Sequence, residues 1–128
     1  MKNDKLKIIV LAKEFLFDID SILCRFPNKE KVMRDKLKSL IYEIIELIYE
    51  SNYLNLNTYE ERRVILQSRI LSKINVIDLL LEESYRKGYI TENIFKCKSR
   101  ELSLLTTKVK GWISYEKNNN KRNSWFLW

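Results

Sequence analysis

The sequence contains no histidine, and among its 128 residues it has only two glycines and one proline. Without histidine, the chain lacks Ser–His–Asp and Cys–His catalytic systems, His-Glu-x-x-His zinc sites and Glu-x-x-His di-iron sites. Gly88 and Gly111 lie too far apart for a Walker loop or a Gly-x-Gly-x-x-Gly nucleotide-binding turn. A row of carboxylates on the second predicted helix is interpreted as a solvated face. We therefore expect no enzymatic activity, no metal site and no cofactor.

The scarcity of glycine and proline also bears on the fold class, because hairpins, sandwiches and barrels need many of both at their turns. A chain with so few turn residues is expected to consist of a few long helices. Apolar residues make up 45% of the chain and charged residues 32%, which is typical of a soluble globular protein. The length favours a single domain.

The two cysteines and the apolar segments bear on the cellular compartment. Cys24 and Cys97 have no Cys-x-x-Cys spacing, so buried packing roles in a reducing compartment are favoured over a single disulfide. The longest apolar candidate for a membrane segment, "LIYEIIELIYE", is interrupted by Glu43 and Glu46. The apolar stretch near the N-terminus is too short and too closely flanked by charge for a signal peptide. We expect no membrane segment and a cytoplasmic location.

Apolar residues recur at spacings of three and four along the chain, which predicts amphipathic helices. The expected helices span residues 4–25, 28–53, 58–87 and 91 to about 115 or 116. Their short connections favour an all-α fold, an antiparallel up-down-up-down four-helix bundle over residues 1–117. Residues 118–128, "NNNKRNSWFLW", are polar and then aromatic. We expect this tail to be flexible, or ordered only against a partner.

Particular residues predict where these helices begin and end. Asn28, Thr58 and Thr91 are candidate N-caps, and Thr58 forms a possible capping box with Glu61. Gly88 follows the third helix at the position where a left-handed residue commonly closes the last turn.

The net charge of +7 is concentrated near the C-terminus, since residues 95–128 carry eight basic and only two acidic side chains. At 100° per residue, four of the basic residues fall in one arc opposite the apolar stripe of the last helix. Lys98 and Lys108 project on the core side and would have to snorkel or face a subunit boundary. A second basic flank lies on the third helix, where a solvated face is the default interpretation. The arc comprises Lys96, Arg100, Lys110 and Lys117, and the flank comprises Arg62, Arg69 and Lys73.

A surface that carries charges of one sign is better explained by binding to a polyanion than by solubility alone, because solvated faces usually interleave charges of both signs. The candidate nucleic-acid-binding residues are therefore Lys96, Arg100, Lys108, Lys110, Lys117, Arg62, Arg69 and Lys73. The seven tyrosines and three tryptophans could add stacking surfaces for single-stranded RNA, although most of these rings are expected in the core or in interfaces. A negatively charged protein partner and the absence of any partner remain alternatives.

Gly111 interrupts the last helix, where a glycine costs about 1 kcal/mol relative to alanine. In projection it lies beside the apolar stripe. We interpret Gly111 and Trp112 as a packing or assembly point, where the missing side chain lets Trp112 or a ring from a neighbouring helix or subunit approach. A frayed final turn is the alternative.

Two short motifs resemble a known family. "RKGYIT" joins the third and fourth predicted helices, and "LLTTKVKGWI" lies near the end of the fourth. Together they resemble the accessory variability determinant proteins of diversity-generating retroelements. The last helix of that family typically carries Gly-Gly-Trp followed by an aliphatic residue, and Lys110 to Ile113 occupy those places here. The family's glycine and aliphatic residue before the last helix are matched by Gly88 and Ile90.

The resemblance covers roughly residues 5–117 and has specific implications. It implies a non-catalytic accessory subunit that forms homopentamers of four-helix bundles with a basic surface. It also implies binding to the reverse transcriptase and to the template-repeat RNA, in support of cDNA synthesis that mutates adenines. The related proteins encoded in intervening sequences of 23S ribosomal RNA genes usually carry an Ile-Pro-x-Asn-Ile-Ala-Glu-Gly-like segment, which "LIYEIIELIYES" does not match. A helical protein–protein interaction module, with "SWFLW" as its docking segment, is the alternative function.

Overall fold

The computed structural model describes residues 2–54 and 56–126, with side chains described for residues 7–54 and 58–118. Within these residues the chain forms four long α-helices and one short 3₁₀ helix, and no strand. The predicted all-α class and the predicted four helices are therefore confirmed. The elements are α1 (Lys2–Leu23), η1 (Asn28–Glu30), α2 (Lys31–Tyr53), α3 (Leu56–Arg86) and α4 (Glu92–Phe126).

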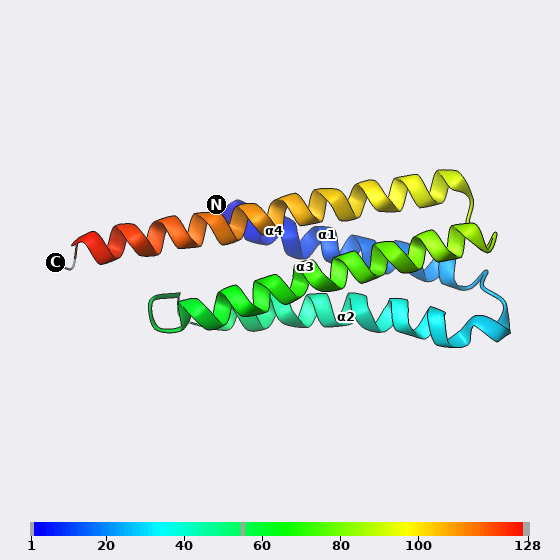
Figure 1. Cartoon of the computed structure of the whole chain (residues 1–128), viewed down its shortest axis with the longest axis horizontal. Helices are drawn as coiled ribbons and strands as arrows, with labels where there is room; N and C mark the ends of the chain where they lie inside the picture. The colour runs from blue at the N-terminus through cyan, green and yellow to red at the C-terminus, as the bar shows by residue number, and fades with distance from the viewer. Residues whose placement is uncertain (1, 55, 127–128) are drawn as a thin grey trace.

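The four helices lie side by side in a bundle (Figure 1). Each of α2 and α4 packs against both α1 and α3. Between α2 and α4, no Cα atoms of the described residues come within 8 Å, so these two helices lie diagonally across the bundle. The α1–α2 and α3–α4 connections lie at one end of the molecule, and the α2–α3 connection lies at the other (Figure 1).

The core consists of the apolar stripes that the helical spacing predicts. In α1 the stripe contributes Ile8, Phe15 and Ile19, each at most 4% exposed, while Leu11 is only partly buried. The stripes of the other helices are buried along most of their length. They contribute Leu37, Leu40, Ile41, Ile44 and Ile48 from α2, Leu66, Ile70, Ile74, Ile77 and Leu81 from α3, and Leu102, Leu105, Val109 and Trp112 from α4.

The connection between α3 and α4 follows its predicted chemistry. Gly88 adopts φ +80°, a left-handed conformation that a residue with a Cβ rarely takes. The N–H of Gly88 donates to the carbonyl of Tyr85 at 2.9 Å, and the N–H of Tyr89 donates to that of Ser84 at 2.9 Å. These two bonds form a Schellman motif that satisfies the last carbonyls of α3. At the start of α4, the Ile94 N–H donates to Oγ1 of Thr91 at 3.2 Å, which confirms the predicted N-cap.

Several predicted helix ends differ from the structure. Asn28 is not the N-cap of α2, because it begins the 3₁₀ turn η1 after Pro27, and α2 starts at Lys31. Non-helical backbone at Tyr59 interrupts the first turn of α3, one residue after the predicted start. The predicted end of the last helix near Tyr115 or Glu116 is wrong, since α4 continues to Phe126. Its C-terminal part extends beyond the α2–α3 connection (Figure 1). The expected flexibility of the tail concerns residues whose side chains lie outside the described set.

The predicted burial of the two cysteines is also wrong, whereas the prediction that they are unpaired thiols is confirmed. Cys24 and Cys97 are free thiols, and both are exposed rather than packed in the core. Cys24 directly follows α1, which ends at Leu23, and Cys97 lies on α4 immediately before the buried Lys98. Over residues 2–54 and 56–126, no helix is both long enough and apolar enough to cross a membrane.

Candidate nucleic-acid interface

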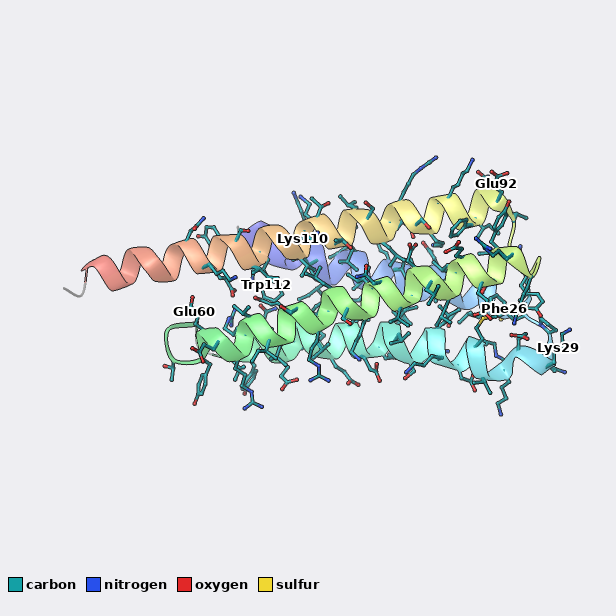
Figure 2. All side chains as sticks on the ribbon, viewed as in Figure 1. Phe26, Lys29, Glu60, Glu92, Lys110 and Trp112 are labelled. Atoms are coloured by element: carbon teal, nitrogen blue, oxygen red, sulfur yellow. The ribbon has the colours of Figure 1, made fainter. Side chains whose placement is uncertain are left out.

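The structure places the predicted basic arc on the outer surface of α4. Lys96, Arg100, Lys110 and Lys117 are all exposed, whereas the opposite side of the helix is buried in the core. Trp112 illustrates the contrast, because it is 2% exposed and lies on the side of α4 that faces α3 (Figure 2). The arc thus consists of exposed cations, of which Lys96 pairs with Glu92 at 3.0 Å, on a helix whose opposite face is packed in the core.

The outer surface of α4 is more strongly basic than the composition of the helix suggests, because most of its acidic side chains lie on the core side. Between residues 93 and 118, the helix contains only two carboxylates, Glu101 and Glu116, and both are engaged on the core side. Glu116 is 2% exposed. Glu101 accepts a hydrogen bond from Nζ of Lys98 at 3.0 Å. No carboxylate of this stretch therefore remains on the outer surface, and Glu92, at the start of the helix, is the acidic residue beside the arc, with Oε1 3.0 Å from Nζ of Lys96.

Lys98 lies where the helical projection predicts, on the core side. It is only 6% exposed. Its Nζ lies 3.5 Å from Oδ2 of Asp18 and 5.3 Å from the centre of the Phe15 ring, both on α1. Two carboxylates and an aromatic face thus compensate the buried charge, which makes Lys98 a structural residue that joins α4 to α1.

Lys108 does not belong to the arc. It is half-buried on the flank of α4 that faces α1. Together with Lys7 it borders a shallow apolar groove whose floor is Val10, Leu11 and Leu104. Its projection on the inner half of the helix is confirmed, and its place among the candidate nucleic-acid contacts stays a prediction.

The basic flank of α3 lies on a different side of the bundle from the arc. Nζ of Lys73 donates to Oε2 of Glu43 on α2 at 2.9 Å. That hydrogen bond is the main reason that the pKa of Glu43 lies below its ordinary value, with burial acting in the opposite direction. Contact between α3 and α4 involves the other flank of α3, where Ser99 donates to Asp78 at 2.9 Å. Arg62 and Arg69 are exposed, but they lie on the α2 side with Lys73, so the two predicted basic sets do not form one continuous surface.

A buried polar cluster, which the sequence reading missed, fixes the C-terminal half of α4. Arg63 of α3, 2% exposed, directs its guanidinium at the carboxylate of Glu116, with Nε 3.2 Å from Oε2 and a second contact from Nη2 to Oε1. Gln67 donates to Oε2 of Glu116 at 2.9 Å, and Nε1 of Trp112 donates to Oε1 at 2.6 Å. Three side chains from two helices thus converge on the Glu116 carboxylate.

The same arginine also closes the end of α2. Its Nη1 donates to the main-chain carbonyls of Ser51 and Leu54, which lie at the C-terminus of that helix and have no partner within it. Arg63 therefore connects three helices. By holding Glu116 inward, it fixes the rotation of α4 that turns Lys110 and Lys117 outward.

The charge state of Glu116 follows from this environment. Burial alone would raise the pKa of the carboxyl, but hydrogen bonds from Arg63, Gln67 and Trp112 and the charge of Arg63 together lower it. Glu116 is therefore ionised at neutral pH, and the cluster is a hydrogen-bonded ion pair.

A sequence signal for the cluster does exist. Arg63 and Gln67 precede the core residues Ile70 and Ile74 by seven positions each, and Glu116 follows Trp112 by four. Polar residues of opposite charge on the apolar stripes of two adjacent helices indicate a buried pair.

Gly111 differs from its predicted role within the chain. A Cβ added there would meet no described atom within 4 Å, so the glycine does not make room for a close contact inside the bundle. The neighbouring Trp112 is a core residue, as expected for packing. The assembly role of Gly111 stays a prediction, since it concerns contacts between chains.

Comparison with protein-family models, with curated proteins and with solved structures finds no match for this chain. The candidate interface therefore rests on its own geometry and charge.

Proposed function

We propose that this protein is a non-catalytic, nucleic-acid-binding accessory subunit of a diversity-generating retroelement. In this role it binds the retroelement's reverse transcriptase and template-repeat RNA and supports mutagenic cDNA synthesis in the cytoplasm. The proposed architecture is an antiparallel up-down-up-down bundle that assembles as a homopentamer, by resemblance to the accessory variability determinant proteins. The short motifs around Gly88 and Gly111–Trp112 support the family assignment.

The observation that carries the nucleic-acid role is the absence of carboxylates from the outer face of α4 between residues 93 and 118, after Glu92, which pairs with Lys96 at the start of the helix. Both acidic side chains between residues 93 and 118 contact basic residues on the core side, Glu101 with Lys98 and Glu116 with Arg63. The exposed cations Lys110 and Lys117 are left without acidic neighbours on their own helix face. Such a surface repels itself unless a polyanion or counter-ions cover it.

Binding to phosphates makes a quantitative prediction about salt. If the four arc residues each contact one phosphate, the logarithm of affinity falls with the logarithm of salt concentration with a slope of about −3 to −4. Affinity for a labelled structured RNA is then expected to fall about 50- to 150-fold between roughly 50 and 200 mM salt. Fluorescence anisotropy measures both quantities.

Paired charge-removal variants test which surface is responsible. Lys110→Gln combined with Lys117→Gln is expected to make the slope less steep by about two units. Lys36→Gln, an exposed lysine on α2, is the control for a change in net charge and is expected to leave the slope almost unchanged. A salt-independent affinity, or an equal effect of the control, would show that the arc is not the binding surface.

The reverse-transcriptase role has a separate test in the neighbourhood of the gene. A reverse-transcriptase gene and a pair of near-identical repeats that differ at adenines would support it. Their absence, together with intact RNA binding, would refute the retroelement assignment but not the nucleic-acid role.

The alternative function, a helical protein–protein interaction module, is favoured by one observation, the continuation of α4 beyond the end of the bundle (Figure 1). Deleting residues 118–128 separates the two functions. Loss of a protein partner with unchanged RNA binding would assign the extension to protein contact, whereas loss of RNA binding alone would assign it to the interface.

A further inference from the structure

The outer arc of α4 contains a restricted set of side chains. Between residues 96 and 118, the side chains within about 60° of the direction of Lys96 carry only basic, hydroxyl or amide groups, and Gly111 at the edge of this sector has no side chain. Ser103, Thr107 and Ser114 lie in the arc, and all three are exposed. Aromatic and aliphatic side chains are absent from it over this described stretch.

The order of these groups along the helix is basic, hydroxyl, basic. Lys96 and Arg100 form the first cluster, and Lys110 and Lys117 form the second. At 1.5 Å rise per residue, the ten residue steps from Arg100 to Lys110 separate the clusters by about 15 Å. Ser103 and Thr107 occupy this interval. Oγ1 of Thr107 donates to the Ser103 carbonyl at 3.1 Å, which leaves its lone pairs available to accept a hydrogen bond.

Recognition of single-stranded RNA generally requires aromatic rings on which unstacked bases can lie. The exposed tyrosines of α2, Tyr42, Tyr49 and Tyr53, recur at helical spacing on one face of that helix. Because α2 and α4 lie diagonally across the bundle, that face is remote from the arc. Tyr115 is on α4, but it lies about 100° around the helix from Ser114. The arc is thus poorly suited to stack bases.

We propose that the outer arc of α4 binds the minor groove of double-helical RNA. The wide, shallow minor groove of A-form RNA displays 2′-hydroxyl groups between two phosphate backbones. The two basic clusters would contact phosphates on either side of the groove, and the hydroxyls of Ser103 and Thr107 would contact 2′-hydroxyls between them. This inference rests on the proposed nucleic-acid function and specifies its substrate class.

The test compares three labelled probes by fluorescence anisotropy with the full chain. They are an RNA duplex of roughly 20 base pairs, slightly longer than the ~16 that a double-stranded-RNA-binding domain spans, the DNA duplex of the same sequence, and an oligouridine of similar length. The RNA duplex is expected to bind most tightly. The double variant Ser103→Ala, Thr107→Ala is expected to weaken RNA-duplex binding roughly 5- to 30-fold, because two hydrogen bonds are lost.

The Ser103→Ala, Thr107→Ala variant, called the hydroxyl variant, is also expected to change a quantity that a general loss of charge would leave unchanged. Its salt slope is expected to equal that of the unsubstituted chain, while its preference for the RNA duplex over the DNA duplex disappears. Alanine is favourable at exposed helix positions, so this variant is expected to fold. The control Ser68→Ala alters an exposed serine of α3 and is expected to change neither quantity.

The outcomes distinguish this inference from the function on which it rests. If oligouridine binds as tightly as the duplex and Tyr49→Ala weakens it, nucleic-acid binding stands and the minor-groove assignment is overturned. Equal affinity for RNA and DNA duplexes with no effect of the hydroxyl variant also overturns it. If none of the three probes binds at low salt, the nucleic-acid function itself is refuted.

Discussion

Replacing Glu116 with alanine would leave the guanidinium of Arg63 buried at 2% exposure without its counter-charge. Gln67 and Trp112 would each lose an acceptor in the same step. Removing one partner of a buried ion pair typically destabilises a protein by about 3–5 kcal/mol. Since a domain is usually stable by about 5–15 kcal/mol, this single change is expected to remove a large part of the free energy of unfolding.

Urea unfolding followed by far-UV circular dichroism measures this loss of stability. For a chain of this size, the loss corresponds to a fall in Tm of about 10–20 °C. Glu82→Ala is the matched control, because Glu82 pairs with Arg86 at 3.0 Å but their side chains are 45% and 76% exposed. That variant is expected to lose less than about 0.5 kcal/mol. The combination of Arg63→Met with Glu116→Leu is expected to recover at least half of the loss, because it removes both charges together.

The pH dependence of the free energy of unfolding provides an independent check on the pair of Arg63 and Glu116. Because the folded environment lowers the pKa of Glu116 below the reference value of 4.5, the ion pair stabilises the fold fully above that pH. Its contribution is lost as pH falls below 4.5 towards the folded-state pKa. Glu116→Gln is expected to flatten this acid limb of the stability curve. A loss below 1 kcal/mol for Glu116→Ala, with an unchanged acid limb for Glu116→Gln, would refute the interpretation of the cluster.

The remaining predictions concern the turns and the arc. Gly88→Ala is expected to destabilise the fold by about 1–2 kcal/mol, because φ +80° is unfavourable for alanine. Gly111→Ala is expected to stabilise the fold by about 0.5–1 kcal/mol, because an added Cβ would lie in open space. Urea unfolding measures the opposite signs of the two changes in the free energy of unfolding. If Gly111→Ala also changes the mass measured by light scattering, the glycine lies in an interface between chains. Thr91→Ala is expected to cost about 1 kcal/mol through loss of the N-cap bond. Glu92→Gln is expected to tighten RNA binding, because it frees Lys96 from its 3.0 Å ion pair; weaker binding would contradict the basic-arc assignment.

The features that were predictable from sequence are those set by local periodicity and local chemistry. The spacing of Ile70, Ile74 and Ile77 was sufficient to place the core side of α3, since a helix fixes which positions share a face. Gly88 and Thr91 were predictable for the same reason, because their roles depend on backbone groups only a few residues away.

The features that were missed depend on contacts between helices. Glu116 was predicted only as a possible end of the last helix, yet it is buried because Arg63, 53 residues earlier, lies opposite it. The helix end was misplaced because this anchored carboxylate is followed by residues with no glycine or proline to stop the helix. Cys24 and Cys97 were misassigned because their exposure depends on how far the neighbouring helices cover each flank.

The position of Arg63 at the junction of α2, α3 and α4 also has a kinetic consequence. Its contact with Glu116 joins residues far apart in sequence, and such contacts generally form after local helices and hairpins have assembled. An interaction that is absent from the folding transition state changes the unfolding rate far more than the folding rate. The ion pair is therefore expected to determine how long the folded chain persists, while the speed of folding is set by the apolar stripes and the short connections.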